Sequence, residues 1–304
     1  MDINALFLSH PRTINTPTTL ITMSDHDDLP TPPPSDDGSD YSSEEAEPRL
    51  TPQELGALFL DFYTFLTTLH FNKSHLKIPP STGWPHITPE SYDHFKSDYA
   101  IEVIRHLPYF SNECEDHIHY KSRPLDLTDC TLEDLKYHKE NDPDQEYWST
   151  ENQQDPSDVF CFSQGYESYG RTFWLLVNDC EIIEDMNRAD MLSSVPVEEF
   201  FEKLKEEYKN LKLIPGKGRL TGEAGHVPER EGRIDRMEVD AQTESWGTDL
   251  DIQYLRQIYR DHGWPNSFDL EGATEAVDEW MEFLAESEGD GTGLDRSYGW
   301  ETAD

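Results

Sequence analysis

The stretch VFCFSQGYESYGRTFWLLVNDCEIIE, residues 159–184, decides the fold because two apolar segments lie on either side of a short polar connection. Thr172–Val177 and Cys180–Glu184 flank Asn178-Asp179, and these two residue types tolerate the positive φ of a type I′ turn. A two-residue connection of this kind fixes the register of a hairpin. It pairs Val177 with Cys180, Leu175 with Ile182 and Trp174 with Ile183. Both faces of each segment carry apolar side chains, which predicts inner strands covered on each side.

A turn bounded by Gly165 and Gly170 precedes the hairpin and follows a further strand predicted over Val159–Ser163. Its glycine spacing is that of a Walker phosphate loop, but Arg171 stands where the phosphate-binding lysine is needed, and a strand follows where a helix is required. A nucleophile elbow also fails, because Gly165 lies three residues before Ser168 and the motif needs two. We therefore interpret the segment as a turn between strands that uses its glycines for positive φ.

Helical periodicity surrounds these strands. The first helix begins at a capping box formed by Thr51 and Glu54, and its apolar stripe runs to about His70. A second helix is predicted from Thr88 to Leu107, where a following proline ends it. Later stripes predict helices over residues 197–211, 249–262 and 268–285. Weaker patterns predict an edge strand over 118–120, a short helix over 131–139, a solvated loop over 139–158 and a short strand over 213–215.

The charge of the chain limits its partners. Among 304 residues, 63 are acidic and 24 are basic, which gives a formal net charge of −39. Such a field repels phosphate backbones and anionic headgroups, so we predict no binding to nucleic acid or to a membrane surface. It keeps a protein soluble and monomeric, and it also favours other proteins, including basic ones, as partners.

The compartment follows from the cysteines and from the absence of long apolar runs. No run approaches the ~20 apolar residues that span a bilayer, and residues 5–8 are too few for the core of a signal peptide. Four cysteines in a long chain without secretory features indicate free, mostly buried thiols in a reducing compartment. We predict a cytoplasmic or nuclear protein.

Composition divides the chain into five parts. They are a disordered acidic, proline-rich segment at 1–49, an α+β core domain at 50–215, a flexible loop rich in glycine and arginine at 216–247, a C-terminal helical addition at 248–285 and a mobile tail at 286–304. A second interpretation makes the basic residues of the loop a docking site for the acidic segment.

No residue pattern points to catalysis, to a cofactor or to a metal. Cys114, His117, His119 and Cys130 would supply soft ligands, but their spacing matches no standard zinc site and no CxxC occurs. A thiol nucleophile paired with one of the 12 histidines stays open as an alternative, because nothing marks out a thiol with a lowered pKa. We predict no catalytic residue, no cofactor and no metal.

The order of these segments carries a family resemblance. An early helix ends near Leu107-Pro108, then come the strand, the small-residue turn and the two apolar strands of 160–183, and then a helix with Phe200-Phe201 and Leu204. In this order the chain resembles the SUKH superfamily, which includes fungal cell-wall-assembly regulators and bacterial toxin-immunity proteins. It is also similar to a group of filamentous-fungal proteins. The resemblance implies an α+β fold with a central, largely antiparallel sheet, a role in binding other proteins and no catalytic residues.

We therefore predict an α+β protein with a central, mostly antiparallel sheet packed by several helices, acting as a non-catalytic interaction or regulatory protein. The residues predicted to bind the partner are Tyr166, Glu167, Tyr169, Arg171 and Trp174, since exposed aromatic and arginine side chains are enriched at protein interfaces. A place in the core is an equally good interpretation of Trp174. The alternative functions are a thiol-dependent hydrolase or transferase and an acidic chaperone for basic proteins.

Overall fold

The computed structural model describes residues 48–92, 94–131, 133, 154–166, 168–187, 191–216, 221–244 and 246–286. The chain divides into two compact units, Met1–Glu45 and Ala46–Asp304, and all described residues belong to the second. The predictions of a disordered acidic segment, a short helix over 131–139 and a mobile tail fall on residues that lie outside the described ones, apart from Pro48, Arg49, Thr131, Glu133 and Glu286.

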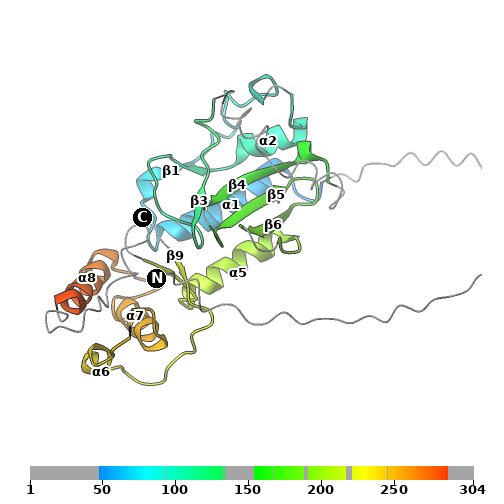
Figure 1. Cartoon of the computed structure of the whole chain (residues 1–304). Helices are drawn as coiled ribbons and strands as arrows, with labels where there is room; N and C mark the ends of the chain where they lie inside the picture. The colour runs from blue at the N-terminus through cyan, green and yellow to red at the C-terminus, as the bar shows by residue number, and fades with distance from the viewer. Residues whose placement is uncertain are drawn as a thin grey trace, which may run out of the picture. The chain divides into compact units, whose positions relative to one another are not determined.

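A five-stranded antiparallel sheet in the order β3-β4-β5-β6-β7 forms the centre of the second unit (Figure 1). Its strands are β3 (Ser122–Pro124), β4 (Val159–Gly165), β5 (Arg171–Leu176), β6 (Glu181–Met186) and β7 (Val195–Pro196). Two small sheets accompany it, formed by β1 (Leu76–Lys77) with β2 (Tyr109–Phe110) and by β8 (Leu213–Pro215) with β9 (Thr221–Glu223). The α+β class and the mostly antiparallel central sheet are thus confirmed.

The register of the β5–β6 hairpin is the predicted one. Leu175 lies opposite Ile182 and Trp174 lies opposite Ile183, and both strands are inner strands of the sheet. The predicted type I′ turn is wrong, because the connection spans residues 177–180 and its positive φ falls on Cys180, at 55°. Neither Asn178 nor Asp179 has a positive φ, so a longer loop preserves the same register.

Helices α1 (Pro52–Thr67) and α5 (Val197–Lys209) cover one face of the sheet (Figure 1). Aromatic rings hold this layer together: Phe59 of α1 lies with its ring centroid 5.0 Å from Phe162 of β4 and 4.8 Å from Phe201 of α5. Phe173 of β5 contacts Phe200 of α5 at 5.0 Å. Edge-to-face pairs of this kind add to the area they bury, so they form the centre of the core.

The capping box predicted at the first helix is confirmed, since the Thr51 side chain accepts from the Glu54 amide and the Glu54 carboxylate accepts from the Thr51 amide. The predicted start of the second helix is wrong. Thr88 is followed by a short 3₁₀ turn, η3 (Glu90–Tyr92), and His94 then adopts a φ of 56°, which breaks the helix. Helix α2 (Asp98–His106) begins at Ser97, whose hydroxyl accepts from the amide of Ala100.

The edge strand predicted at 118–120 is displaced to β3. The amide of Ile118 donates to the carbonyl of Ser122 at 3.0 Å, and Lys121 has a φ of 48°. A tight turn therefore occupies the predicted strand, and pairing with β4 begins only at Ser122. Two further 3₁₀ turns, η2 (Lys73–His75) and η4 (Pro156–Asp158), precede β1 and β4.

The region after β8 contains β9 and α6 (Arg236–Asp240), both within the predicted flexible loop of 216–247. Helices α7 (Asp249–Asp261) and α8 (Leu270–Glu286) follow where they are predicted, and a second capping box, formed by Thr248 and Asp251, starts α7. Their buried side chains join the same core cluster as the sheet.

Arg256 of α7 connects these helices to the core. Its buried guanidinium donates to the carbonyls of Leu211 (3.1 Å), Val227 (2.9 Å) and Ala224 (2.6 Å). One side chain thereby supplies a donor to three backbone carbonyls, of which that of Ala224 also accepts from the Val227 amide at 3.0 Å. Among the described helices, none is long and apolar enough to cross a membrane.

Candidate protein-binding site

Backbone hydrogen bonds fix the β4–β5 turn, residues 166–170, from two sides. The amide of Tyr166 donates to the carbonyl of Lys121 at 3.0 Å, just before β3. On the other side, the amide of Tyr169 donates to the carbonyl of Asn187 at 3.0 Å, just after β6. The turn is therefore held by segments from both neighbouring strands, and its conformation is set by the sheet.

The glycines that bound this turn serve close packing of the backbone. A Cβ at Gly170 would lie 2.4 Å from the carbonyl oxygen of Tyr166, and a Cβ at Gly165 would lie 2.7 Å from the carbonyl carbon of Gly170. Neither glycine has a positive φ, so the prediction that the turn uses these glycines for positive φ is wrong. The left-handed residue of the turn is Tyr169, with a φ of 65°.

Tyr169 is an unusual choice for that position. A bulky residue with positive φ is a conformational outlier, and the side chain of Tyr169 is 46% exposed, so little burial compensates for the strain. Tyr166, on the same turn, and Tyr120, whose carbonyl accepts from the amide of Arg171 at 3.2 Å, are both half-buried. The Tyr166 hydroxyl lies 3.3 Å from Nε2 of the buried His117. We call these three residues, Tyr120, Tyr166 and Tyr169, the tyrosine turn.

The structure brings three of the five predicted binding residues together and separates a fourth. Tyr166, Tyr169 and Arg171 meet at the turn, whereas Glu167 lies outside the described residues. Trp174 is half-buried on the opposite face of the sheet from α5, in a small apolar cluster with Val159, Leu176, Ile183 and Met191. Tyr120 is absent from the prediction because only the pairing of β3 with β4 brings it to the turn.

Arg171 directly follows the turn, and its guanidinium forms ion pairs with strands β6 and β9. Its Nη2 and Nε lie 2.6 Å and 3.0 Å from Oε1 of Glu223 on β9, and its Nε lies 3.3 Å from Oε1 of Glu184 on β6. His119 borders the cluster, with Nδ1 3.5 Å from the Glu223 carboxylate, but this nitrogen accepts from the Tyr120 amide and forms no ion pair. Arg171 is thus a half-buried link between β5, β6 and β9, and on the adjoining turn Tyr169 is exposed while Tyr166 and Ser168 are half-buried.

Burial controls the charge state of this cluster. Burial of the Glu184 carboxylate away from water raises its pKa, even though the positive charge of Arg171 acts to lower it. Burial, with the positive charges of Arg171 and Lys203, lowers the pKa of His119 to about 3. Its Nδ1 accepts a hydrogen bond from the amide of Tyr120 at 2.9 Å, so the neutral ring also positions a residue of the tyrosine turn.

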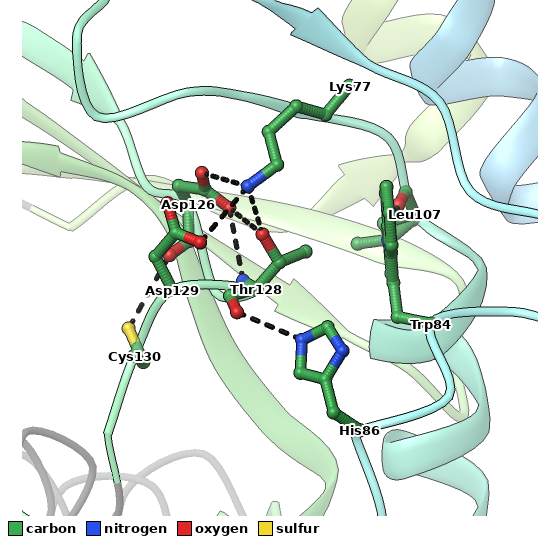
Figure 2. Close-up of polar contacts among 8 residues, drawn as sticks. All are labelled: Lys77, Trp84, His86, Leu107, Asp126, Thr128, Asp129 and Cys130. Atoms are coloured by element: carbon green, nitrogen blue, oxygen red, sulfur yellow. Dashed lines mark hydrogen bonds and ion pairs between the residues drawn. The ribbon is translucent and has the colours of Figure 1, made fainter.

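A second polar cluster surrounds Lys77 of β1 (Figure 2). The Lys77 ammonium donates to Asp126 (2.8 Å) and Asp129 (3.2 Å) and also to the hydroxyl of Thr128. The Asp126 carboxylate is fully buried and accepts from the amide and hydroxyl of Thr128 at 3.1 Å and 2.6 Å. His86 contacts the carbonyl of Thr128 through Nε2 at 2.9 Å.

Cys130 also donates to the Asp126 carbonyl at 3.5 Å, so Lys77, His86 and Cys130 all contact the 126–130 loop (Figure 2). This arrangement is typical of side chains that hold a loop in a fixed conformation. Sequence reasoning missed it, because Lys77 and Asp126 are far apart in the chain. The Asp-x-Thr spacing of Asp126 and Thr128, which favours a local hydrogen-bonded turn, was the available signal.

The four cysteines lie in buried or half-buried positions. All four cysteines are free, with Cys114 and Cys180 buried, and Cys130 and Cys161 half-buried. Burial raises the pKa of Cys114 to about 12 and also raises the pKa of Cys180, which keeps both as thiols. No group of three or more potential metal ligands occurs among the described residues.

A hollow of about 260 Å³ lies between the 229–234 loop and α7. Three arginines line it, and each is paired with a carboxylate on this chain: Arg230 with Glu238, Arg233 with Asp261 and Arg260 with Glu229. Among the basic residues of the 216–247 loop, Arg230 and Arg233 are therefore each paired with a carboxylate of the same chain. Lys217 and Arg219 lie outside the described residues.

Comparison with known proteins gave no match: no family model matches the chain, and neither a curated protein nor a solved structure is significantly similar to it.

Proposed function

We propose that the chain is a non-catalytic protein-interaction or regulatory protein of the SUKH-like type, and that the tyrosine turn is its binding surface. The observation that carries this proposal is the state of Tyr169, which is strained in its backbone and exposed in its side chain. Strained residues of this kind are retained at functional sites, where the surrounding structure holds them in place.

The composition and rigidity of the tyrosine turn support the same proposal. Tyrosine is enriched at the centres of protein interfaces because it offers a large apolar area together with a hydroxyl. The hydrogen bonds from Tyr166 to Lys121 and from Tyr169 to Asn187 hold the turn before any partner arrives. A preorganised surface loses less conformational entropy on binding, so few contacts are needed for affinity.

The net charge of the chain favours a partner of opposite charge. A net charge of −39 attracts a basic protein and raises its rate of encounter at low ionic strength. The order of helix, strand, turn, two strands and helix also supports the SUKH-like assignment. A cytoplasmic or nuclear location is part of the proposal.

Site-specific photocrosslinking in cells tests the binding surface. A photoreactive phenylalanine analogue is placed at position 169 and, as a matched control, at position 270, where Leu270 is 42% exposed on α8. We expect a defined crosslinked protein from position 169 that position 270 does not give. Crosslinks that are the same from both positions, or no crosslink from position 169, would rule out the tyrosine turn as the binding surface.

A further inference from the structure

The hollow between the 229–234 loop and α7 gathers more hydrogen-bond donors than the chain uses. Arg230, Arg233 and Arg260 all line it. A guanidinium has five N–H donors, and each of these three uses two of them in a bidentate pair with one carboxylate. Among the described residues, no other group accepts a hydrogen bond from them. Each guanidinium therefore keeps three donors for a further partner.

The ion pairs around the hollow carry a positive charge in excess, in contrast to the chain as a whole. The buried Arg256 guanidinium lies 3.6 Å from the carboxylate of Glu229, which also pairs with Arg260 at 2.8 Å. With Arg230 and Arg233, each paired with its own carboxylate, four guanidiniums meet three carboxylates. Repulsion from the remaining acidic residues is screened beyond about 8 Å at physiological ionic strength. The local charge therefore favours an anion in the hollow.

Side-chain hydrogen bonds from α7 hold the wall of the hollow in place. The Ile234 amide donates to Oε1 of Gln257 at 2.7 Å, and the Ile234 carbonyl accepts from Nε2 of the same side chain at 3.1 Å. Gln253 donates to the carbonyl of Pro228 at 3.0 Å, just before the loop. Ile234 also adds an apolar side chain to the lining. A volume of about 260 Å³ lies just below that of sites for drug-sized molecules, so the hollow suits a small organic ligand.

We propose that this hollow is a binding site for a small organic phosphate. A phosphate monoester presents several acceptor oxygens and a charge of about −1.5 to −2 at pH 7, and guanidiniums bind it through two parallel hydrogen bonds each. The free donors of Arg230, Arg233 and Arg260 would bind the phosphate, and the organic part would contact Ile234. This inference goes beyond the proposed function, because it uses none of the residues of the tyrosine turn and holds or fails without them.

Calorimetric titration of the full chain tests this site, with phenyl phosphate as the probe and benzoate as the carboxylate reference. We expect phenyl phosphate to bind about fivefold more tightly than benzoate or better. Arg233→Gln should weaken binding of phenyl phosphate by about fivefold or more, because it removes a guanidinium from the hollow. Asp261→Asn should strengthen it, because it releases Arg233 from its own carboxylate. A pair that served stability alone would not give these opposite effects.

A matched ion pair elsewhere separates the hollow from the overall charge. Arg49 and Glu198 form the same bidentate arrangement, at 2.7 Å and 2.9 Å, and neither lines the hollow. Arg49→Gln and Glu198→Gln should bind phenyl phosphate as the unmodified chain does. All four variants should unfold at nearly the same temperature, because exposed pairs contribute little to stability. Equal weakening by Arg49→Gln and Arg233→Gln, weaker or unchanged binding in Asp261→Asn, equal binding of benzoate, or no binding to the unmodified chain would overturn the proposal.

Discussion

The backbone amide of Tyr169 donates a hydrogen bond to the carbonyl of Asn187 at 3.0 Å, and this bond holds a tyrosine in a left-handed conformation at the surface. Among the five described non-glycine residues with positive φ, Tyr169 is the only large hydrophobic one that is exposed. The relationship therefore connects the sheet, which imposes the conformation, with a surface that we propose to bind a partner. It also shows which residues around the turn should be sensitive to substitution.

Gly170→Ala should destabilise the protein by about 1–3 kcal/mol, because the new methyl group would lie 2.4 Å from the Tyr166 carbonyl oxygen. Gly222→Ala on β9 is the matched control, since its nearest neighbour would be 3.8 Å away. Urea denaturation measures the free energy of unfolding of both variants. Equal small effects at the two positions would contradict the close approach that we describe.

Acid should destabilise the fold through His119. Its pKa is lowered from 6.5 to about 3 in the folded state, so between these values the unfolded state binds a proton that the folded state does not. The contribution of His119 is therefore full above pH 6.5 and is lost as the pH falls towards 3, with a slope of up to about 1.4 kcal/mol per pH unit.

His119→Asn keeps an acceptor for the Tyr120 amide but does not titrate, so it should reduce this slope. Some slope should remain, because burial also lowers the pKa of His70 to about 3. The measurement is urea denaturation at several pH values between 4 and 7. An unchanged slope in the variant would show that His119 does not titrate as described.

Lys77→Met should cost about 2–4 kcal/mol, because it leaves the buried Asp126 carboxylate without its cation. The double variant Lys77→Met/Asp126→Asn should lose less than the sum of the two single changes. A double-mutant cycle by chemical denaturation gives the coupling energy between the two residues. Additive losses would mean that the ammonium and the carboxylate do not interact.

Arg256→Met should destabilise the protein by about 3 kcal/mol, because the buried carbonyls of Leu211 and Val227 lose the Arg256 donor and that of Ala224 keeps only the Val227 amide. Arg260→Met is the control on the same helix. Arg260 is exposed and pairs with Glu229, and such pairs contribute about 1 kcal/mol at most. A comparison of unfolding midpoints distinguishes the two, and similar losses would contradict the role given to Arg256.

Local sequence chemistry predicted much of this fold. Thr51 starts α1 through the predicted capping box, and α7 begins at Asp249 as predicted. The pairing of Leu175 with Ile182 was predicted from the position of the Asn178-Asp179 connection, although the predicted turn type is wrong. The start of α2 was missed because Thr88 and Ser97 are both good caps, and only packing decides that the chain breaks at His94.

The site was less predictable, because it depends on contacts between distant segments. Tyr166, Tyr169 and Arg171 were predicted as binding residues, but Tyr120 reaches them only through the β3–β4 pairing. Close approach of the backbone explains Gly165 and Gly170, and a single sequence does not distinguish this from a requirement for positive φ. The ion pair between Arg171 and Glu223 likewise depends on where β9 packs.

Tyr169→Asn tests the central claim most directly, because asparagine tolerates positive φ but removes the exposed aromatic ring. The account predicts that this variant keeps or gains stability, by up to about 1 kcal/mol in urea denaturation, and no longer retains in affinity capture the partner identified by crosslinking at position 169. Tyr169→Phe should retain that partner. A loss of more than about 1 kcal/mol in Tyr169→Asn, with capture of the partner unchanged, would show that Tyr169 serves the fold and would contradict the account.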